Sequence, residues 1–300
     1  MNTSFVGEFQ VRQVLVYGGR QRRTRVDQTH LKCQLDKGFT TMAYDLVHVF
    51  KRLGVVPSNV ILVGAWEGQE IKSFLEAGIQ RAYLFEAEPI AINVLTKSYG
   101  DDKRVLLFQG AVASKDGQVK KFHILNHGSS SLLAPNLDKL RVILPDFQIE
   151  NEILVNTITL DTCLRDHWNQ WNENKLNTLL IVDIQGGELE ALKGGKELLK
   201  RVGWIHSEVS TTEIYQNQNT LTELDQFLSE SGFKRVSTRI YSERSHGDAL
   251  YFRPNLITYF FQIAMKIGDL HWNLARKRPE WIPSLSHFGV GKSMFCSSRS

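Results

Sequence analysis

One segment, residues 59–70 (NVILVGAWEGQE), constrains the fold of this chain more than any other. It begins with a short apolar run from Val60 to Val63, the pattern of a parallel strand that is buried on both faces. Gly64 and Gly68 then predict a tight turn, and apolar residues return after it at helical spacing. Strand, glycine turn and helix in this order indicate an α/β unit. The turn and the helix N-terminus of such a unit can approach a ligand closely.

A second apolar run, residues 81–85, ends in Glu86, 22 residues after Gly64. An acid at the tip of a second strand can accept hydrogen bonds from both hydroxyls of a ribose. A dinucleotide site also needs the glycines of G-x-G-x-x-G, but Trp66 and Gln69 stand at the second and third of those positions. S-adenosylmethionine has no phosphate and tolerates a looser turn. The pattern therefore favours a methyltransferase over a nicotinamide dehydrogenase, although a merely tight turn would look the same.

A second strand–turn–helix unit occupies residues 179–195 (LLIVDIQGGELEALKGG), where the strand ends in Asp183. Shorter motifs surround it: residues 85–89 (FEAEP), 110–114 (GAVAS), 128–133 (GSSSLL), 155–161 (VNTITLD), 204–209 (WIHSEV) and 247–253 (GDALYFR). This order resembles the FkbM family of S-adenosylmethionine-dependent methyltransferases. The resemblance covers residues 40 to 253 and is most specific around Asp183 and in the serine segment.

The resemblance implies a Rossmann-like α/β fold of the class I methyltransferase type, with a mostly parallel seven-stranded sheet and helices on both faces. It also implies S-adenosylmethionine as cofactor and O-methylation of a small-molecule hydroxyl, commonly on a sugar or a secondary metabolite. The residues expected at the cofactor are Gly64, Ala65, Glu67, Gly68, Glu86, Ala111, Ser130 and Asp183.

The chain departs from the family pattern at several positions near the expected cofactor. Leu62 stands where the family has an acid, Trp66 replaces the usual turn asparagine, and Gln185 replaces a glutamate. Ile181 and Gly187 replace a lysine and an alanine. An alternative is therefore a non-catalytic binding or scaffold protein that keeps the fold with a degenerate cofactor site. Glu67 is a candidate to replace the lost acid.

Methyl transfer to oxygen requires alignment of two reactants and a base for the hydroxyl proton. Asp183 is the first candidate base, because it ends the predicted strand at the start of residues 179–195, where the family resemblance is closest; the structural alternative is a helix N-cap. Glu208, His206 and His127 are further candidates, although a lone histidine near a strand end is more often structural. Asp248 matches a family position or caps the last turn. No metal-type spacing is present, and we expect no metal site.

The periodicity divides the chain into an N-terminal appendage (residues 1–38), a methyltransferase-like domain (39–253) and a C-terminal helical extension (254–300). The domain opens with a predicted helix over residues 39–53. Residues 126–152 form the longest stretch without a regular period, and we predict a lid or substrate loop there. The extension predicts an amphipathic helix that packs on the body or on a second copy of the chain, as a homo-oligomer contact.

Composition agrees with a cytoplasmic enzyme. The net charge is only +4 in 300 residues and the basic residues are scattered, so we expect no nucleic-acid partner. Three cysteines (Cys33, Cys163 and Cys296) without metal or disulfide spacing predict reduced thiols. Glu8 and Arg12 stand where a signal peptide would be apolar, and no apolar run reaches the ~20 residues of a transmembrane segment.

Overall fold

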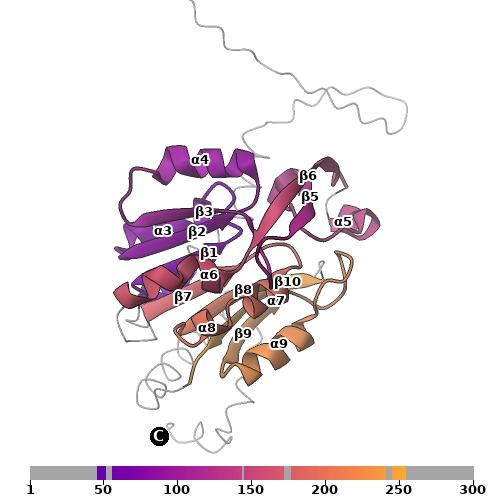
Figure 1. Cartoon of the computed structure of the whole chain (residues 1–300). Coiled ribbons are helices and arrows are strands. Elements are labelled where there is room, and N and C mark those ends of the chain that lie inside the picture. Colours follow the sequence, from indigo (N-terminus) through magenta and orange to yellow (C-terminus); the bar gives the residue numbers. More distant parts are fainter. Residues whose placement is uncertain (1–45, 52–55, 144, 172–176, 241–244, 255–300) are drawn as a thin grey trace, which may run out of the picture. The chain divides into compact units, whose positions relative to one another are not determined.

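The computed structural model describes residues 46–51, 56–143, 145–171, 177–240 and 245–254 (Figure 1). The predicted N-terminal appendage lies outside the described residues, and so does the predicted C-terminal extension apart from Pro254. Residues 46–51 are helical, within the helix predicted for residues 39–53. None of the described helices is long and apolar enough to cross a membrane.

The main sheet has seven strands in the order β3-β2-β1-β7-β8-β10-β9. The first five of these pair in parallel, whereas β10 is antiparallel to both of its neighbours. The predicted mostly parallel seven-stranded sheet is therefore confirmed. The strands are β1 (Asn59–Val63), β2 (Arg81–Glu86), β3 (Val105–Gln109), β7 (Thr178–Val182), β8 (Trp204–Ser210), β9 (Lys234–Ile240) and β10 (His246–Phe252).

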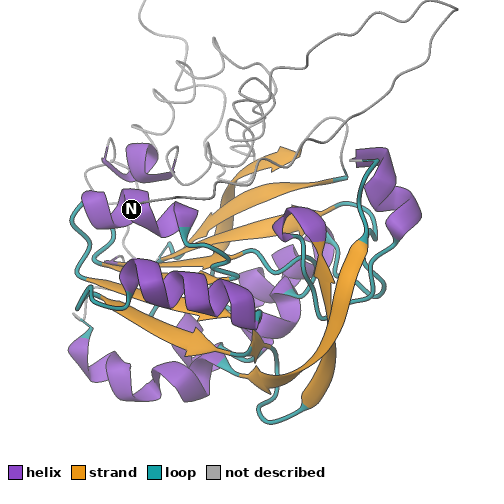
Figure 2. Cartoon of the chain, turned by 90° about the horizontal axis from the view of Figure 1, so that it is seen from above, coloured by secondary structure: helices purple, strands orange, loops and turns teal. Residues whose placement is uncertain are grey.

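Helices cover both faces of this sheet (Figure 2). Alternate residues of each central strand point to opposite faces, so Ile61 and Val63 join one hydrophobic core while Val60 and Leu62 join the other. Burial on both faces explains the continuous apolar runs in the sequence. One core is closed by α3 (Gln69–Glu76) and α4 (Pro89–Tyr99). The other is closed by α6 (Leu160–Leu164), α7 (Glu188–Lys193), α8 (Lys196–Leu199) and α9 (Leu221–Glu230).

A smaller sheet, in the order β4-β6-β5, follows the third strand of the main sheet. Its strands are β4 (Ala111–Val112), β5 (Val119–Leu125) and β6 (Ile149–Ile158), and β5 and β6 pair as an antiparallel arm. The prediction that residues 126–152 lack regular structure is wrong in part. They include η1 (Asn126–Gly128), α5 (Leu137–Ile143) and the start of β6. Leu140 and Phe147 are buried there with Tyr215, in elements too short to show a period in the sequence.

Candidate functional site

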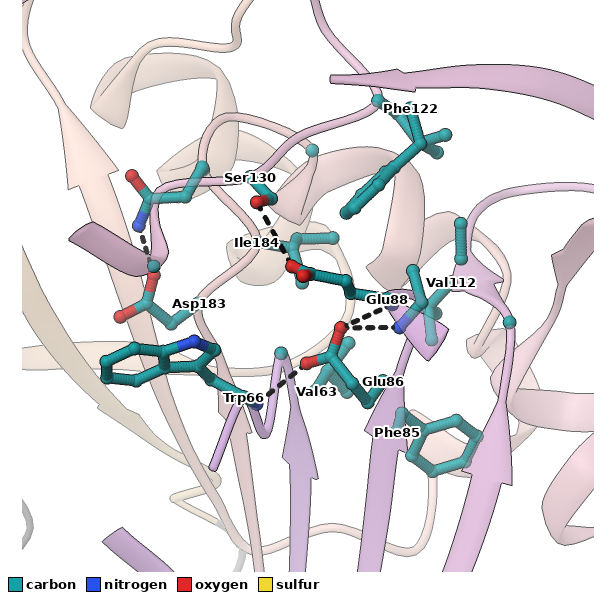
Figure 3. A pocket seen from close by; sticks show the side chains of 18 residues that line it. Val63, Trp66, Phe85, Glu86, Glu88, Val112, Phe122, Ser130, Asp183 and Ile184 are labelled. Carbon is teal, nitrogen blue, oxygen red and sulfur yellow. Dashed lines mark hydrogen bonds between the residues drawn. The ribbon is translucent and has the colours of Figure 1, made fainter. Parts of the chain in front are cut away.

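A pocket opens at the carboxyl ends of the central strands (Figure 3). The space between its lining residues is about 620 Å³, a volume that includes open solvent. The chain passes from β1 to β2 on one side and returns to β7 on the other, so the pocket lies where the strand order changes direction. The turn after β1, the end of β2 and the end of β7 form its walls. The segment after β3 and the residues that follow β5 complete it.

Glu86 ends β2, lines this pocket and is 8% exposed. One of its carboxylate oxygens accepts the N–H groups of Ala87 and Glu88 at 2.7 and 2.8 Å, and the other accepts the N–H of Trp66 at 2.7 Å. Burial raises the pKa of Glu86, and these three hydrogen bonds oppose the rise. The side chain ties the turn after β1 to the loop after β2. Since a carboxylate has about four acceptor positions, about one remains for a ligand.

The glycine turn after β1 is shaped by the approach of two strands. Gly64 has φ 84°, and a Cβ there would overlap the carbonyl oxygen of Asp183 on the neighbouring strand. The N–H groups of Gly64 and Ala65 both donate to the carbonyl of Phe85 at 3.0 Å, so these amides are not free for a ligand. Gly64 lines the pocket through its backbone. Ala65, Glu67 and Gly68, which the sequence also places at the cofactor, are not among the lining residues.

Trp66 is the most unusual residue of the site. Its φ is 43°, a left-handed conformation that bulky residues rarely adopt, and its side chain is 37% exposed. The indole packs against Gly128, where a Cβ would lie 3.1 Å from two ring atoms. Two other residues nearby are left-handed. Gln185 lines the pocket, and His127 directly precedes the lining residue Gly128. Backbone strain of this kind persists only where the surrounding structure holds it, and it collects at functional sites.

Asp183 follows β7 and also lines the pocket. Its carboxylate accepts a hydrogen bond from the amide of Gln185 at 2.7 Å. The strand register places Asp183 level with Glu208 on β8, and Glu208 lies opposite Asp248 on β10. Burial raises the pKa of Asp183, against the effect of its hydrogen bonds with Gln185 and Glu208. The structure therefore brings together two of the predicted catalytic residues, Asp183 and Glu208.

Further carboxyl groups lie behind Asp183. Burial and then the charges of Asp183, Glu188 and Asp248 raise the pKa of Glu208 well above its usual value. The pKa of Glu188 rises to about 7 and that of Glu70 to about 8, in each case first by burial and then by the charge of Asp183. One oxygen of Glu208 has no hydrogen-bond partner among the described residues. Such a cluster holds protons at neutral pH, because ionising all of its members would bury repelling charges.

The two predicted histidines lie away from the pocket lining. His206 is 9% exposed on β8, two residues before Glu208, and burial lowers its pKa to about 4, so the ring is neutral at pH 7. His127 lies 3.1 Å from the carboxylate of Asp146 and packs edge-on against Phe147. Neither ring lines the pocket. Both histidines keep their catalytic roles only as predictions.

The remaining predicted residues do face the pocket. Ala111 lines it after β3, and Ser130 lines it with its hydroxyl 3.4 Å from Glu88. Sequence reasoning missed Glu88 and also Tyr215, whose hydroxyl donates to the carbonyl of Ser129 at 2.9 Å and supports this wall. Glu88 belongs to the motif FEAEP at residues 85–89, so this acid was visible in the sequence. No sequence signal indicated Tyr215.

The charge of the lining limits what can bind. It contains three carboxylates, Glu86, Glu88 and Asp183, and within the described part of the chain it contains no lysine, arginine or histidine. Hydroxyl groups and cationic centres fit this set, whereas phosphates and other dianions do not. No group of three or more histidine, cysteine or acidic side chains in the described ranges is placed to hold a metal ion.

The sequence resembles those of known methyltransferases. A family model described as the methyltransferase FkbM domain matches residues 63–235, more than half of the chain. The 2-O-methyltransferase NoeI of Sinorhizobium fredii (strain NBRC 101917 / NGR234) is 26% identical over 167 residues, which cover 54% of this chain and 68% of that protein.

Solved structures of low similarity were also found. Magnesium protoporphyrin IX methyltransferase from Synechocystis PCC 6803 with bound SAM has a TM-score of 0.43 at 9% identity, covering 77% of this chain and 86% of that one. Human N-acetylserotonin methyltransferase in complex with SAM has a TM-score of 0.39 at 10% identity, covering 74% and 55%. These values are too low to support an inference about the site.

Proposed function

The chain belongs to the FkbM methyltransferase family and is an S-adenosylmethionine-dependent methyltransferase; we propose that it transfers the methyl group to a hydroxyl oxygen of a small molecule. The observation that supports this proposal is the pocket at the strand ends, which is lined by carboxylates and contains Asp183 beside the turn after β1. Carboxylates can accept hydrogen bonds from hydroxyl groups and can accept the proton that a hydroxyl loses.

The residues of the pocket fit the cofactor. The remaining acceptor position of Glu86 suits a ribose hydroxyl, and Glu88 with Ser130 offers further polar contacts beside it. Gly110 and Ala111 leave an apolar wall after β3 that suits an adenine ring. When bound, the cofactor supplies an electrophilic methyl group on a positively charged sulfur.

Asp183 is the proposed general base. Methylation forms an O–CH3 bond as the S–CH3 bond breaks, and the hydroxyl proton passes to the Asp183 carboxylate. The raised pKa of Asp183 makes its ionised form a better proton acceptor than an ordinary aspartate. Glu208 lies level with Asp183 on β8. The two carboxyl groups can share one proton, so that one of them is neutral. Gln185 holds the orientation of Asp183 through its 2.7 Å hydrogen bond.

The acceptor that we propose is a sugar or a sugar-like secondary metabolite. A relative named as a 2-O-methyltransferase supports a hydroxyl acceptor, and an exposed indole beside carboxylates suits a ring that carries several hydroxyl groups. The lack of a basic residue in the described lining argues against a phosphorylated acceptor.

The scaffold alternative rested on lost polar residues, and their positions weaken it. Leu62 is 1% exposed within the core under α3 and does not line the pocket, so it replaces no ligand contact there. Gln185 still bonds Asp183.

Calorimetric titration with S-adenosylmethionine and transfer of a labelled methyl group to a panel of neutral sugars and glycosides would test the proposal. We expect measurable binding in the wild type, and transfer that falls at least 100-fold in Asp183→Asn. Asp138→Asn, an exposed acid on α5, is the matched control and should behave like the wild type. Lack of binding in the folded wild type would restore the scaffold alternative. Unchanged transfer in Asp183→Asn would remove Asp183 from the base role.

A further inference from the structure

Trp66 lines the pocket proposed for the cofactor, and contacts of its backbone and its ring hold it in place. The left-handed backbone at residue 66 is held by the hydrogen bond from its N–H to Glu86. Gly128 lies against the ring, and a Cβ at this position would lie 3.1 Å from the indole. The indole is still 37% exposed and borders the pocket. A bulky aromatic residue held in a strained conformation at a pocket wall indicates a functional role.

The carboxylates near Trp66 in the pocket lining define what the ring can meet. Figure 3 shows the indole of Trp66 beside Asp183, with the Glu86 carboxylate on the other side of its backbone. We assign Glu86 to the ribose and Asp183 to the proton of the acceptor. In S-adenosylmethionine the sulfur is bonded both to the C5′ carbon of the ribose and to the transferred methyl group. The chemistry of the cofactor therefore places its sulfur between the partners of these two residues.

The charge around the ring favours a cation. The lining has three acidic side chains and no basic side chain among the described residues. The face of an indole attracts cations, and the attraction grows when the site is shielded from water. An ordinary apolar side chain at position 66 would supply contact area without this selectivity.

Resting on the proposed function, we propose that Trp66 and the carboxylate lining make the site selective for the sulfonium of S-adenosylmethionine over the neutral thioether of S-adenosylhomocysteine. The indole acts as a specificity-determining residue for the charged cofactor. Loss of the methyl group removes the positive charge, so the same contacts then favour release of the product.

The test is calorimetric titration of three compounds: S-adenosylmethionine, S-adenosylhomocysteine and sinefungin, whose amine replaces the sulfonium with another cation. In the wild type we expect both cations to bind about 3- to 30-fold more tightly than S-adenosylhomocysteine. Trp66→Leu should lower this ratio by weakening the cations alone, down to the part that the carboxylates supply, and Trp66→Phe should keep more of it. Trp168→Leu, a tryptophan that does not line the pocket, is the control and should keep the wild-type ratio.

The outcomes separate the two proposals. Equal affinity of the wild type for the charged and neutral compounds would overturn the selectivity. An equal loss of affinity for all three compounds in Trp66→Leu would also overturn it, because such a loss indicates apolar packing alone. Binding of S-adenosylhomocysteine would in both cases leave the methyltransferase site intact. Failure of all three compounds to bind the folded wild type would instead overturn the proposed function. If Trp66→Leu does not fold, the ratio in Trp66→Phe decides, and a wild-type ratio there refutes the role of the indole.

Discussion

Replacement of Glu86 should affect both the stability of the protein and the affinity for the cofactor. In Glu86→Gln one oxygen remains to accept the N–H groups of Ala87 and Glu88, but the new amide N–H2 group faces the N–H of Trp66 and cannot accept from it. In Glu86→Ala all three N–H groups lose their partner. The two variants therefore remove one and three of the bonds that join the turn after β1 to the loop after β2.

The expected magnitudes follow from the kind of bond that is lost. A hydrogen bond to a charged group contributes about 1.5–3 kcal/mol, so Glu86→Gln should lower the free energy of unfolding by about 2 kcal/mol. Water can reach part of this loop, since Trp66 is exposed and Ala87 is half-buried, so Glu86→Ala should lose about 3–4 kcal/mol rather than three full bonds. For a domain of this size these losses lower Tm by about 4–8 °C and 6–16 °C.

Urea denaturation followed by circular dichroism measures the first effect, and calorimetry of the folded variants measures the second. Glu86→Ala should bind S-adenosylmethionine about 2 kcal/mol more weakly, because charge-assisted bonds to the ribose are removed. Glu88→Gln, in the same loop but with only a 3.4 Å contact to Ser130, is the control and should stay within about 0.5 kcal/mol of wild-type stability. Wild-type stability in Glu86→Gln would refute the tie between the two loops. Wild-type affinity in Glu86→Ala would refute the ribose contact.

Four further outcomes are expected. Gly64→Ala should fail to fold or lose several kcal/mol by thermal unfolding, because its Cβ would overlap the backbone of Asp183; near-native Tm would contradict this. Leu62→Asp should destabilise the protein by about 3 kcal/mol or more without tighter cofactor binding, since it buries an unpaired carboxylate. The native state holds the proton of Glu70 up to about pH 8, so the free energy of unfolding falls as pH rises from 4.5 to 8. Urea denaturation at several pH values should show a shallower fall in Glu70→Gln, and an unchanged dependence on pH would contradict the raised pKa of Glu70. Hydrogen exchange within residues 126–152 should slow when cofactor and acceptor bind, and equal exchange would refute a lid.

The strands of the fold were predictable because their environment is uniform. The runs from Val60 to Val63 and from Leu179 to Val182 are buried on both faces, so every residue in them is apolar and the run stands out in the sequence. The order of the motifs then fixed the succession of strands and helices. The elements between β5 and β6 were missed because α5 is short and, among its described side chains, only Leu140 joins a core. One buried position does not make a period.

The site was predictable at strand tips and much less so in the turns. Asp183 and Glu86 end buried strands, and the ends of parallel strands meet at one edge of the sheet. The turn residues Ala65 and Glu67 were expected at the cofactor, but whether a turn residue faces the pocket depends on the dihedral angles of the backbone, which the sequence does not specify. Leu62 shows the same limit for a residue of the core. Its replacement of a family acid suggested a lost ligand contact, whereas the side chain belongs to the core.

Two of the departures from the family pattern, at positions 66 and 185, are left-handed residues that line the pocket. Asparagine adopts a positive φ more readily than most residues, so the usual asparagine of the family at position 66 suits the observed φ of 43°. A tryptophan there is strained, at a cost on the order of 1 kcal/mol or more, and the Glu86 carboxylate that holds it is the group proposed for the ribose. Gln185 is likewise left-handed while it orients Asp183. The hydrogen bonds that sustain the strain thus belong to the residues proposed for binding and catalysis. Trp66→Asn would relieve the strain and raise stability, but it would remove the indole that selects the charged cofactor.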